Sequence, residues 1–404
     1  MLSVKEQMEV IRRGTVEIIP EDELIKKLGH SIKTKKPLRI KQGFDPTAPD
    51  IHLGHTVGLR KLKQFQELGH NIVLIIGDYT GMVGDPSERS STRPQLTRDE
   101  VMKNAETYQK QFFKIIDKRK TEVHFNGEWF SRMSFLDVIH LASRFTLARI
   151  LEREDFSRRY SQQVPISLHE LFYPLMQAYD SVAIKADVEI GATEQKFNLL
   201  AGRQIQEVYG QEPQVILTLP VLAGVDGVQR MSKSTGNYIG IDEPPSEIFG
   251  KVMSIPDELI YPYFELLTDL PLEDLKKIKK ELDEEKENPM VLKKRLGREI
   301  VSLYHSKKDA TKAQEEFERV FSQKELPEEI PVFKLDYDEP KIWIVKLLTT
   351  TKLCSSSGQA RRLIRQGGVY LDDKRVEDEN LEIPVQGEKL LKVGKRKFLK
   401  VIKV

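Results

Sequence analysis

Two histidines three residues apart, His52 and His55, are the side chains of this chain best placed to act on a phosphate. They open a helical pattern that runs from about residue 54 to residue 68, and their spacing puts both rings on one helix face. A glycine- and proline-rich turn, residues 43–50, precedes them and follows a short apolar run. A strand, a glycine turn and a helix N-terminus together favour anion binding, because the first backbone N–H groups of a helix have no partner within the helix.

A cationic loop far along the chain adds positive charge, since residues 230–234 read Arg-Met-Ser-Lys-Ser. The longer stretch 227–234 resembles a Walker A loop, but Ser232 replaces its second glycine and residues 235–238 do not continue as a helix. Alone, the histidine pair could be a fragment of a metal site or simply solvated, and the loop could be a charged turn. Together they indicate a nucleotidyl-transfer site for ATP.

His-Leu-Gly-His at 52–55 followed by Arg-Met-Ser-Lys-Ser at 230–234 resembles the signature pair of class I aminoacyl-tRNA synthetases. The resemblance covers nearly the whole chain and is closest to the bacterial tyrosyl-tRNA synthetase family. It implies a tyrosine–tRNA ligase, which forms tyrosyl-adenylate and pyrophosphate from tyrosine and ATP and then transfers tyrosyl to the 3′-terminal adenosine of tRNA(Tyr). The other stretches that carry it are Gly-Phe-Asp-Pro-Thr at 43–47, Gly-Asp-Pro-Ser at 84–87, Tyr-Pro-Leu-Met-Gln-Ala-Tyr-Asp at 173–180 and Ile-Gly-Ala-Thr-Glu-Gln at 190–195.

Attack of a carboxylate on the α-phosphate of ATP needs alignment and charge stabilisation more than covalent help. Thr47 and the two histidines would give the phosphates neutral hydrogen bonds, and the two cations of the loop would meet the departing pyrophosphate. The resemblance thus implies catalytic roles for Thr47, His52, His55, Arg230 and Lys233. It implies ATP contacts for Gly54, Glu194, Ser232 and Ser234.

The amino-acid side of the site follows from residues 173–180, where Tyr173, Gln177 and Asp180 share one helical face by their spacing. A partly buried amphipathic helix is the alternative interpretation of this stripe. The resemblance implies that Asp180 accepts a hydrogen bond from the substrate phenol. The other implied tyrosine contacts are Tyr173, Gln177 and Asp85 at the α-amino group, Gln195 at the carboxylate, and Asp45 and Asn126 as further neighbours.

Three positions depart from the family pattern. Arg230 stands where lysine is usual, and Glu194 stands where an aspartate often binds the ribose. Lys41 occupies the place of a tyrosine that commonly contacts the phenol. We expect its ammonium to donate to the phenol oxygen while pairing with Asp180 or Asp78, with a solvated lysine as the alternative.

Residues 1–243 alternate nearly continuous apolar runs with helical patterns. This predicts an α/β, Rossmann-like doubly wound catalytic domain with a parallel sheet and a cleft at the carboxyl ends of its strands. The clearest strands are 38–40, 72–76 and 215–219, and the clearest helices are 97–118 and 134–153.

The rest of the chain predicts three parts. Residues 244–322 are helical and charged (271–287, 289–305 and 310–321), which indicates a helical domain that by resemblance binds the tRNA anticodon. Residues 323–340 are acidic and proline-bearing, as in a linker. Residues 341–404 resemble a small α+β RNA-binding fold of the S-four type, with helices at 343–351 and 358–366 and strands at 369–371, 390–393 and 397–402. Its candidate phosphate contacts are Arg361, Arg362 and Arg365.

Charge distribution supports this division. Residues 341–404 hold 15 Lys and Arg against 7 Asp and Glu, whereas the first 340 residues hold 49 against 55. A basic module on a mildly acidic body is typical of proteins that bind a polyanion. We expect tRNA(Tyr), ATP and L-tyrosine as partners.

The composition bounds the remaining possibilities. One cysteine, Cys354, excludes an intrachain disulfide and a thiolate zinc cluster. No apolar run approaches a membrane span and the first residues are charged, so we expect a cytoplasmic address and no membrane partner. Family analogy implies a homodimer, with ATP and Mg²⁺ as a substrate complex, no protein metal site and no tightly bound cofactor. The rival functions are a tryptophanyl-tRNA synthetase, an RNA-binding protein with an inactive body, and a metabolic adenylyl- or cytidylyltransferase.

Overall fold

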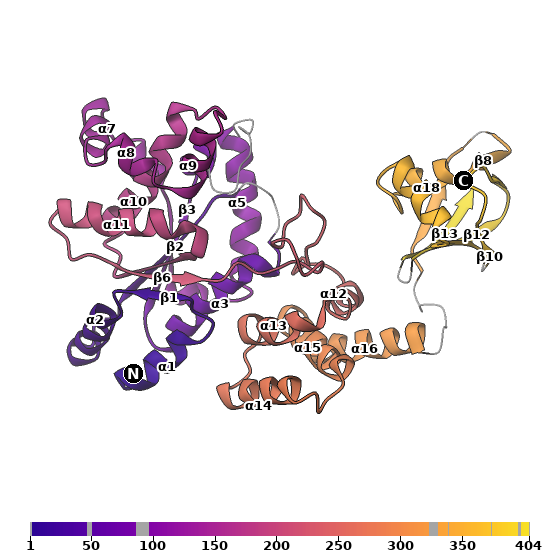
Figure 1. Ribbon diagram of the computed structural model, residues 1–404, viewed down its shortest axis with the longest axis horizontal. Coiled ribbons are helices and arrows are strands. Elements are labelled where there is room, and N and C mark those ends of the chain that lie inside the picture. The colour runs from indigo at the N-terminus through magenta and orange to yellow at the C-terminus, as the bar shows by residue number, and fades with distance from the viewer. Residues whose placement is uncertain are drawn as a thin grey trace. The chain divides into compact units, whose positions relative to one another are not determined.

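A computed structural model describes residues 2–46, 51–85, 97–322, 330–337, 339–372, 374–394 and 397–403 (Figure 1). The chain forms two compact units. The first contains residues up to Pro244 together with Lys251–Tyr304, and the second contains Pro245–Gly250 and residues from His305 onward.

A six-stranded sheet organises the first unit, in the order β1-β6-β5-β2-β3-β4. Five neighbouring strands are parallel, namely β6, β5, β2, β3 and β4. At the edge of the sheet, β1 pairs antiparallel with β6. The chain leaves β2 toward β3 and β4 on one side and returns to β5 and β6 on the other, so the strand order reverses between β2 and β5. Ligands of open α/β sheets bind at the carboxyl ends of the strands at such a point. The strands are β1 (Glu17–Ile19), β2 (Arg39–Phe44), β3 (Asn71–Ile76), β4 (Thr121–Phe125), β5 (Val188–Ala192) and β6 (Val215–Leu219).

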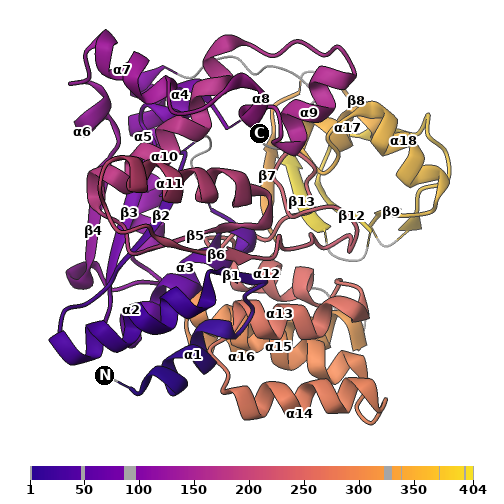
Figure 2. The ribbon, with the colours of Figure 1, turned by 60° about the vertical axis from the view of Figure 1, so that its left-hand side comes forward.

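Helices cover both faces of this sheet, with α3 and α5 on one side and α10 and α11 on the other (Figures 1 and 2). The doubly wound arrangement predicted from the sequence is therefore confirmed. The helices around the sheet are α1 (Val4–Arg12), α2 (Glu21–Thr34), α3 (Leu53–Glu67), α4 (Thr80–Val83), α5 (Arg98–Phe112), α6 (Gly127–Phe130), α7 (Phe135–Ala142), α8 (Leu147–Ile150), α9 (Glu154–Ser161), α10 (Tyr173–Ile184) and α11 (Lys196–Val208).

Local capping explains where two of these helices begin. Thr97 caps α5, and Glu100 returns the contact to the Thr97 backbone at 2.8 Å, as the sequence predicted. The single helix predicted at 134–153 is wrong, because it is broken into α7 and α8. The hydroxyl of Thr146 accepts the backbone N–H of Arg149 and so starts the second helix.

The helical region predicted as one domain, 244–322, is divided between the two units. Helices α13, α14 and α15 belong to the first, where Arg13 donates to the backbone carbonyls of Glu265, Thr268 and Leu270 at 2.6–3.1 Å. This half-buried guanidinium accounts for one carbonyl near the end of α13 and two just beyond it, and so fastens these helices to the N-terminal segment. The elements are α12 (Pro245–Val252), α13 (Ile260–Leu267), α14 (Leu272–Asp283), α15 (Pro289–Tyr304) and α16 (Lys307–Ser322).

The second unit contains a five-stranded sheet in the order β10-β9-β12-β13-β7 and a two-stranded sheet of β11 and β8. The predicted linker 323–340 is wrong in part, because β7 lies within it and pairs in parallel with β13. Alternation places Leu335 of β7 in the apolar core, where it is 3% exposed. The elements are β7 (Val332–Leu335), β8 (Lys341–Trp343), α17 (Ile344–Thr350), α18 (Ser357–Arg365), β9 (Val369–Leu371), β10 (Lys374–Arg375), β11 (Glu382–Pro384), β12 (Glu388–Val393) and β13 (Lys397–Lys403).

Candidate active site

The histidine pair lies at the start of α3, directly beyond β2. Nδ1 of His52 accepts the backbone N–H of Gly54 at 3.2 Å, and Nδ1 of His55 accepts the backbone N–H of His52 at 3.3 Å. The two ring centroids are 4.0 Å apart. Leu53 donates its backbone N–H to Ile239 at 2.9 Å, which joins the histidine turn to the segment that follows the cationic loop.

Both histidines are neutral at physiological pH. Burial lowers the pKa of His52 to about 2, with the neighbouring His55, Lys233 and Arg230 acting in the same direction. Burial also lowers the pKa of His55 to about 4, and Lys233 contributes. Because each Nδ1 accepts a backbone N–H, each ring carries its proton on Nε2. The pair therefore offers two neutral N–H donors at the carboxyl end of the sheet.

The cationic loop lies beside this pair. Its Met231 backbone N–H donates to Leu222 O at 2.8 Å, and a Cβ atom added to Gly54 would lie 3.6 Å from Met231 Cβ. The hydroxyls of Ser232 and Ser234 are 2.9 Å apart. The loop thus brings Arg230 and Lys233 close enough to the two histidines to help lower the pKa of each ring. Thr47, the remaining predicted catalytic residue, lies outside the described residues.

Glu194 connects the loop to the end of β5. Its carboxylate lies 3.5 Å from the Arg230 guanidinium, so two of the positions that depart from the family pattern are partners. Burial raises the pKa of Glu194 to about 7, Asp85 adds to the rise, and Arg153 opposes it. The carboxyl group therefore changes charge near neutral pH.

Asp45, at the end of β2, is hydrogen-bonded to side chains from two helices, Tyr173 of α10 and Thr80 of α4. The Tyr173 hydroxyl donates to one carboxylate oxygen of Asp45 at 2.8 Å, and the Thr80 hydroxyl donates to the other at 2.7 Å. Gly77 permits this approach, since a Cβ atom there would stand 2.0 Å from Asp45. Asp45 is thereby oriented through both of its oxygens.

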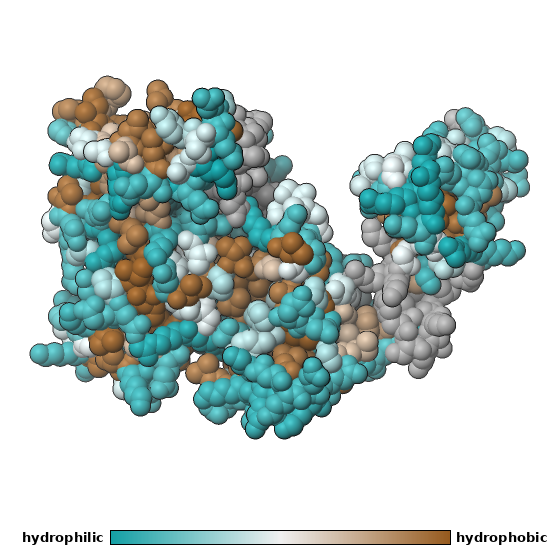
Figure 3. All heavy atoms as spheres, viewed as in Figure 1, coloured by the Kyte–Doolittle hydropathy of each residue, from teal (hydrophilic) through white to brown (hydrophobic). Residues whose placement is uncertain are grey.

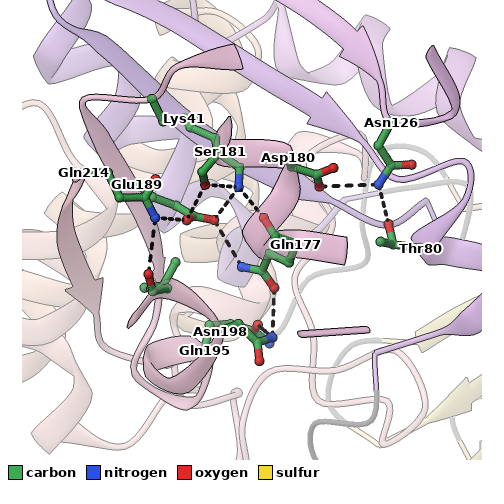
Figure 4. A network of polar contacts seen from close by, with 12 residues as sticks. Lys41, Thr80, Asn126, Gln177, Asp180, Ser181, Glu189, Gln195, Asn198 and Gln214 are labelled. Atoms are coloured by element: carbon green, nitrogen blue, oxygen red, sulfur yellow. Dashed lines mark hydrogen bonds and ion pairs between the residues drawn. The ribbon is translucent and has the colours of Figure 1, made fainter. Parts of the chain in front are cut away.

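Amide and charged side chains from several elements form a network of polar contacts (Figure 4). The Asn198 amide donates to Gln177 at 2.8 Å and to Gln195 at 2.9 Å, and Gln195 donates to Asp85 at 2.6 Å. The other oxygen of Asp85 pairs with the buried Arg153 at 2.9 Å. The structure thus brings together three predicted tyrosine contacts, Gln177, Gln195 and Asp85, from three separate segments.

Lys41 does not take the place expected for it. Its ammonium donates to Gln177 O at 2.8 Å and to Ser181 Oγ at 2.7 Å, and it pairs with Glu189 at 2.9 Å. These contacts use all three ammonium hydrogens, and neither Lys41 nor Glu189 is exposed by more than 1%. The predicted pairing with Asp180 or Asp78 is wrong, because β5 places Glu189 beside Lys41 and the Asp78 carboxylate accepts the Gly127 backbone N–H.

Asp180 lies on the same helix as Tyr173 and Gln177 and is 3% exposed. One carboxyl oxygen accepts the Trp129 indole N–H at 2.9 Å, and the other accepts the Asn126 amide at 3.4 Å. Burial raises the pKa of Asp180 to about 7, while Lys41 and these two donors oppose the rise. The spacing argument for a shared helix face is compatible with this arrangement, and the role of Asn126 as a further tyrosine contact stays a prediction.

Sequence reasoning missed four residues that hold the site: Arg153, Asn198, Glu189 and Trp129. Glu189 and Asn198 could have been suspected, since a charge in an apolar strand and an amide one turn after Glu194 are unusual core residues. Arg153 carried no such signal, because Asp85 is 68 residues away in the sequence and is brought to it by the fold.

The three arginines predicted to bind RNA are exposed on α18. Arg365 forms two hydrogen bonds with Glu379, at 3.0 and 3.1 Å, and Arg361 lies over the ring of Trp343 at 5.3 Å. Arg362 is exposed on the same helix. Two of the three side chains are therefore held in place by neighbours.

Among the residues described, no three His, Cys, Asp or Glu side chains gather in a way that could hold a metal ion. No helix within the described part of the chain is long and apolar enough to cross a membrane.

Comparison with known proteins identifies the class. Residues 33–322 match the model of the class I tRNA synthetases (W and Y), and residues 342–388 match the S4 domain. The chain belongs to the class I tRNA synthetases for tryptophan and tyrosine. The predicted fold class, including the C-terminal S4 domain, is confirmed.

Within this class, the chain is similar to tyrosine–tRNA ligases. The chain is 53% identical to the tyrosine–tRNA ligase of Moorella thermoacetica, over 98% of this chain and 96% of that protein. It is 51% identical to the tyrosine–tRNA ligase of Thermotoga maritima, over 99% and 98%. The structure of the Archaeoglobus fulgidus tyrosyl-tRNA synthetase, complexed with L-tyrosine, is 25% identical and covers 77% of this chain and 99% of that one, with a TM-score of 0.63.

Proposed function

We propose that this site joins tyrosine to ATP as tyrosyl-adenylate and then transfers tyrosyl to the terminal adenosine of tRNA(Tyr). The predicted activity, tyrosine–tRNA ligase, is confirmed at the level of the family by relatives of that name that align along nearly the whole chain. The observation that carries the assignment of residues is the placement of a buried carboxyl, Asp180, on the same helix as Tyr173 and Gln177.

Tyrosine would bind with its phenol at Asp180 and its α-ammonium at Asp85, Tyr173 and Gln177. The Trp129 and Asn126 donors hold the Asp180 carboxyl in one orientation, which lets it meet the phenol hydroxyl without rearrangement. Arg153 fixes Asp85 in the same way. Gln195 lies next to Asp85 and would direct the substrate carboxylate toward the α-phosphate.

ATP would bind along the start of α3. The two Nε2–H groups of His52 and His55 donate to phosphate oxygens as negative charge develops on them. Because each Nδ1 already accepts a backbone N–H, the neutral rings act as donors and do not compete as bases. Glu194 accepts from the ribose hydroxyls, Gly54 leaves space for the adenine, and Ser232 and Ser234 offer hydroxyls to the nucleotide. Arg230 and Lys233 neutralise the departing pyrophosphate. Mg²⁺ would arrive on the triphosphate, as is usual for this ion.

Transfer to tRNA would use the second unit. Its S4 domain carries the exposed Arg361, Arg362 and Arg365, which suit backbone phosphates. The charged helices within residues 244–322 would approach the anticodon.

We also propose that the chain acts as a homodimer in the cytoplasm. Large apolar side chains are exposed on and near α7, with Phe135 at 80%, Leu136 at 59% and Ile139 at 48%, and the apolar surface gathers over this region in Figure 3. Contiguous exposed apolar surface marks an interaction site, and a second copy would cover it. The neighbouring Ala142 and Phe145 pack inward and do not join this surface.

The proposed function is tested by charging. The purified chain, given ATP, Mg²⁺ and labelled tyrosine, should form tyrosyl-tRNA with a tRNA(Tyr) transcript. Labelled tryptophan with a tRNA(Trp) transcript is the control for the other specificity of the family. Charging of tryptophan in place of tyrosine would contradict the proposal.

A further inference from the structure

The loop that carries Arg230 and Lys233 is closed on itself by one buried side chain, that of Asn237. Asn237 is 5% exposed, although it follows the exposed residues Ser234 and Thr235. Its amide contacts the loop backbone at Arg230 and at Ser232.

All the hydrogen-bonding groups of the Asn237 amide are used. Its Nδ2 donates to Asp226 Oδ2 at 2.9 Å and to Arg230 O at 3.0 Å. Its Oδ1 accepts the Ser232 backbone N–H at 2.8 Å and the Thr235 hydroxyl at 2.7 Å. An amide has two donors and one oxygen with two lone pairs, so the side chain is fully satisfied.

The surroundings are built to keep this amide in place. The other oxygen of Asp226 accepts the backbone N–H groups of Val228 and Gln229 at 3.1 and 3.2 Å. Gly224 stands against the amide, because a Cβ atom there would lie 2.3 Å from Asn237 Cγ. The backbone of Asn237 also accepts the Val225 N–H at 3.0 Å.

We infer that Asn237 is a positioning residue for adenylate formation: it holds the backbone on both sides of Lys233 so that the loop moves and docks as one rigid piece. The inference rests on the proposed function, in which Arg230 and Lys233 meet the pyrophosphate. Ser232 and Thr235, which flank Lys233, are both fixed to the same amide oxygen, and Arg230 is fixed through its carbonyl. A fully satisfied buried network specifies one conformation, whereas a partly satisfied one does not.

The chemistry requires an amide and not a carboxylate. Aspartate at 237 would keep the acceptor for Ser232 and Thr235 but would set a second carboxylate oxygen against Asp226 and the Arg230 carbonyl. Two carboxyl groups in contact raise the pKa of one of them, because both cannot ionise. Protonation would restore a donor, so Asn237→Asp should regain function as the pH is lowered.

The experiment measures single-turnover formation of tyrosyl-adenylate and equilibrium tyrosine binding in the full chain. Asn237→Ala should slow adenylate formation about tenfold to a hundredfold, since a displacement of about 1 Å of a catalytic group has effects of this size. The dissociation constant of tyrosine should stay the same. Gly224→Ala displaces the amide without changing it and should produce the same pattern. Val228→Ala, at a side chain 87% exposed on the same loop, is the matched control and should behave as wild type.

The pH dependence separates positioning from a general loss of stability. Relative to wild type, Asn237→Asp should recover activity as the pH falls toward the raised pKa of the paired carboxyl groups, because one proton then restores a donor between them. Adding Asp226→Asn supplies an amide donor from the other side, so the double variant should be more active than Asn237→Asp and lose this pH dependence.

Three results would overturn the inference. Asn237→Ala could form adenylate as fast as the wild type, or it could change only the affinity for tyrosine. Asn237→Asp could show the pH profile of the wild type. A wild-type chain that forms no tyrosyl-adenylate would instead overturn the proposed function, so the two failures are distinguishable.

Discussion

The backbone N–H of His52 donates to Nδ1 of His55, which fixes the proton of the His55 ring on Nε2. A glutamine at this position places its amide N–H near the site of Nε2, whereas an asparagine is too short to reach it. We therefore predict that His55→Gln retains about tenfold more adenylate-forming activity than His55→Asn, the value of roughly one hydrogen bond to a charged group. Single-turnover kinetics measure the difference. If His55→Asn is the more active variant, the donor is not at Nε2.

Asp180 is predicted to set the preference for tyrosine over phenylalanine. In Asp180→Ala, the Trp129 and Asn126 donors lose their partner and the phenol loses its acceptor, so selectivity should fall about tenfold to a hundredfold. The ratio of kcat/KM for tyrosine and phenylalanine in ATP–pyrophosphate exchange measures this.

Asp180→Asn is the matched control, because it keeps an oxygen toward the pocket and should lose less. Equal selectivity in wild type and Asp180→Ala would remove Asp180 from the phenol site.

Glu194 should give ATP binding a pH dependence. Its pKa is raised to about 7, so the carboxylate, which we propose accepts from the ribose, is the main form above pH 7 and is lost as the pH falls through 7. The KM for ATP should therefore rise from pH 8 to pH 6, by about three- to tenfold as the ionised fraction falls.

Glu194→Gln should have a high and nearly pH-independent KM. The histidines cannot account for an inflection near pH 7, because their pKa values are lowered to about 2 and about 4. Asp180, whose pKa is also raised to about 7, is assigned to the phenol of tyrosine, so its titration should change the KM for tyrosine and not the KM for ATP. An inflection that persists in Glu194→Gln would contradict this assignment.

The C-terminal arginines should contribute unequally to tRNA binding. Arg365 already pairs with Glu379, and a phosphate must compete with that carboxylate. We predict that Arg362→Ala lowers the slope of log affinity against log salt by roughly 0.7–0.9, the value of one phosphate contact, and that Arg365→Ala lowers it less.

Filter binding of tRNA(Tyr) across a salt series measures these slopes. Removal of residues 330–404, which takes out β7 together with the sheet it belongs to, should spare tyrosine activation and weaken tRNA charging. Charging that is unchanged across the salt series would contradict an RNA-binding role for this module.

Periodicity and capping predicted those parts of the fold that depend on neighbouring residues. The apolar runs at 72–76 and 215–219 are β3 and β6, and the capping box at Thr97 begins α5. The strand β4 escaped notice because its residues are only half-buried at the sheet edge, which dilutes the apolar signal. The strand β7 lies in a stretch whose sequence predicts a linker, because the strand it pairs with, β13, is more than 60 residues away.

In the candidate site too, relationships between residues close in the sequence were predictable and those between distant residues were not. Tyr173, Gln177 and Asp180 could be assigned to one helix from their spacing alone. The partner of Lys41 could not, because Glu189 is brought to it by strand pairing across 148 residues, and local sequence carries no record of that neighbour. Asn237 was equally hidden, since an asparagine after a glycine is typical of an exposed turn.

Tyrosine-dependent ATP–pyrophosphate exchange, measured for the wild-type chain beside Lys233→Ala, tests the central claim most directly. The wild type should exchange with tyrosine and not with tryptophan or phenylalanine. Lys233→Ala should exchange about a hundredfold to a thousandfold more slowly with unchanged tyrosine affinity, as expected for the loss of one transition-state donor. Exchange driven by tryptophan, or a Lys233→Ala variant as fast as wild type, would contradict the account.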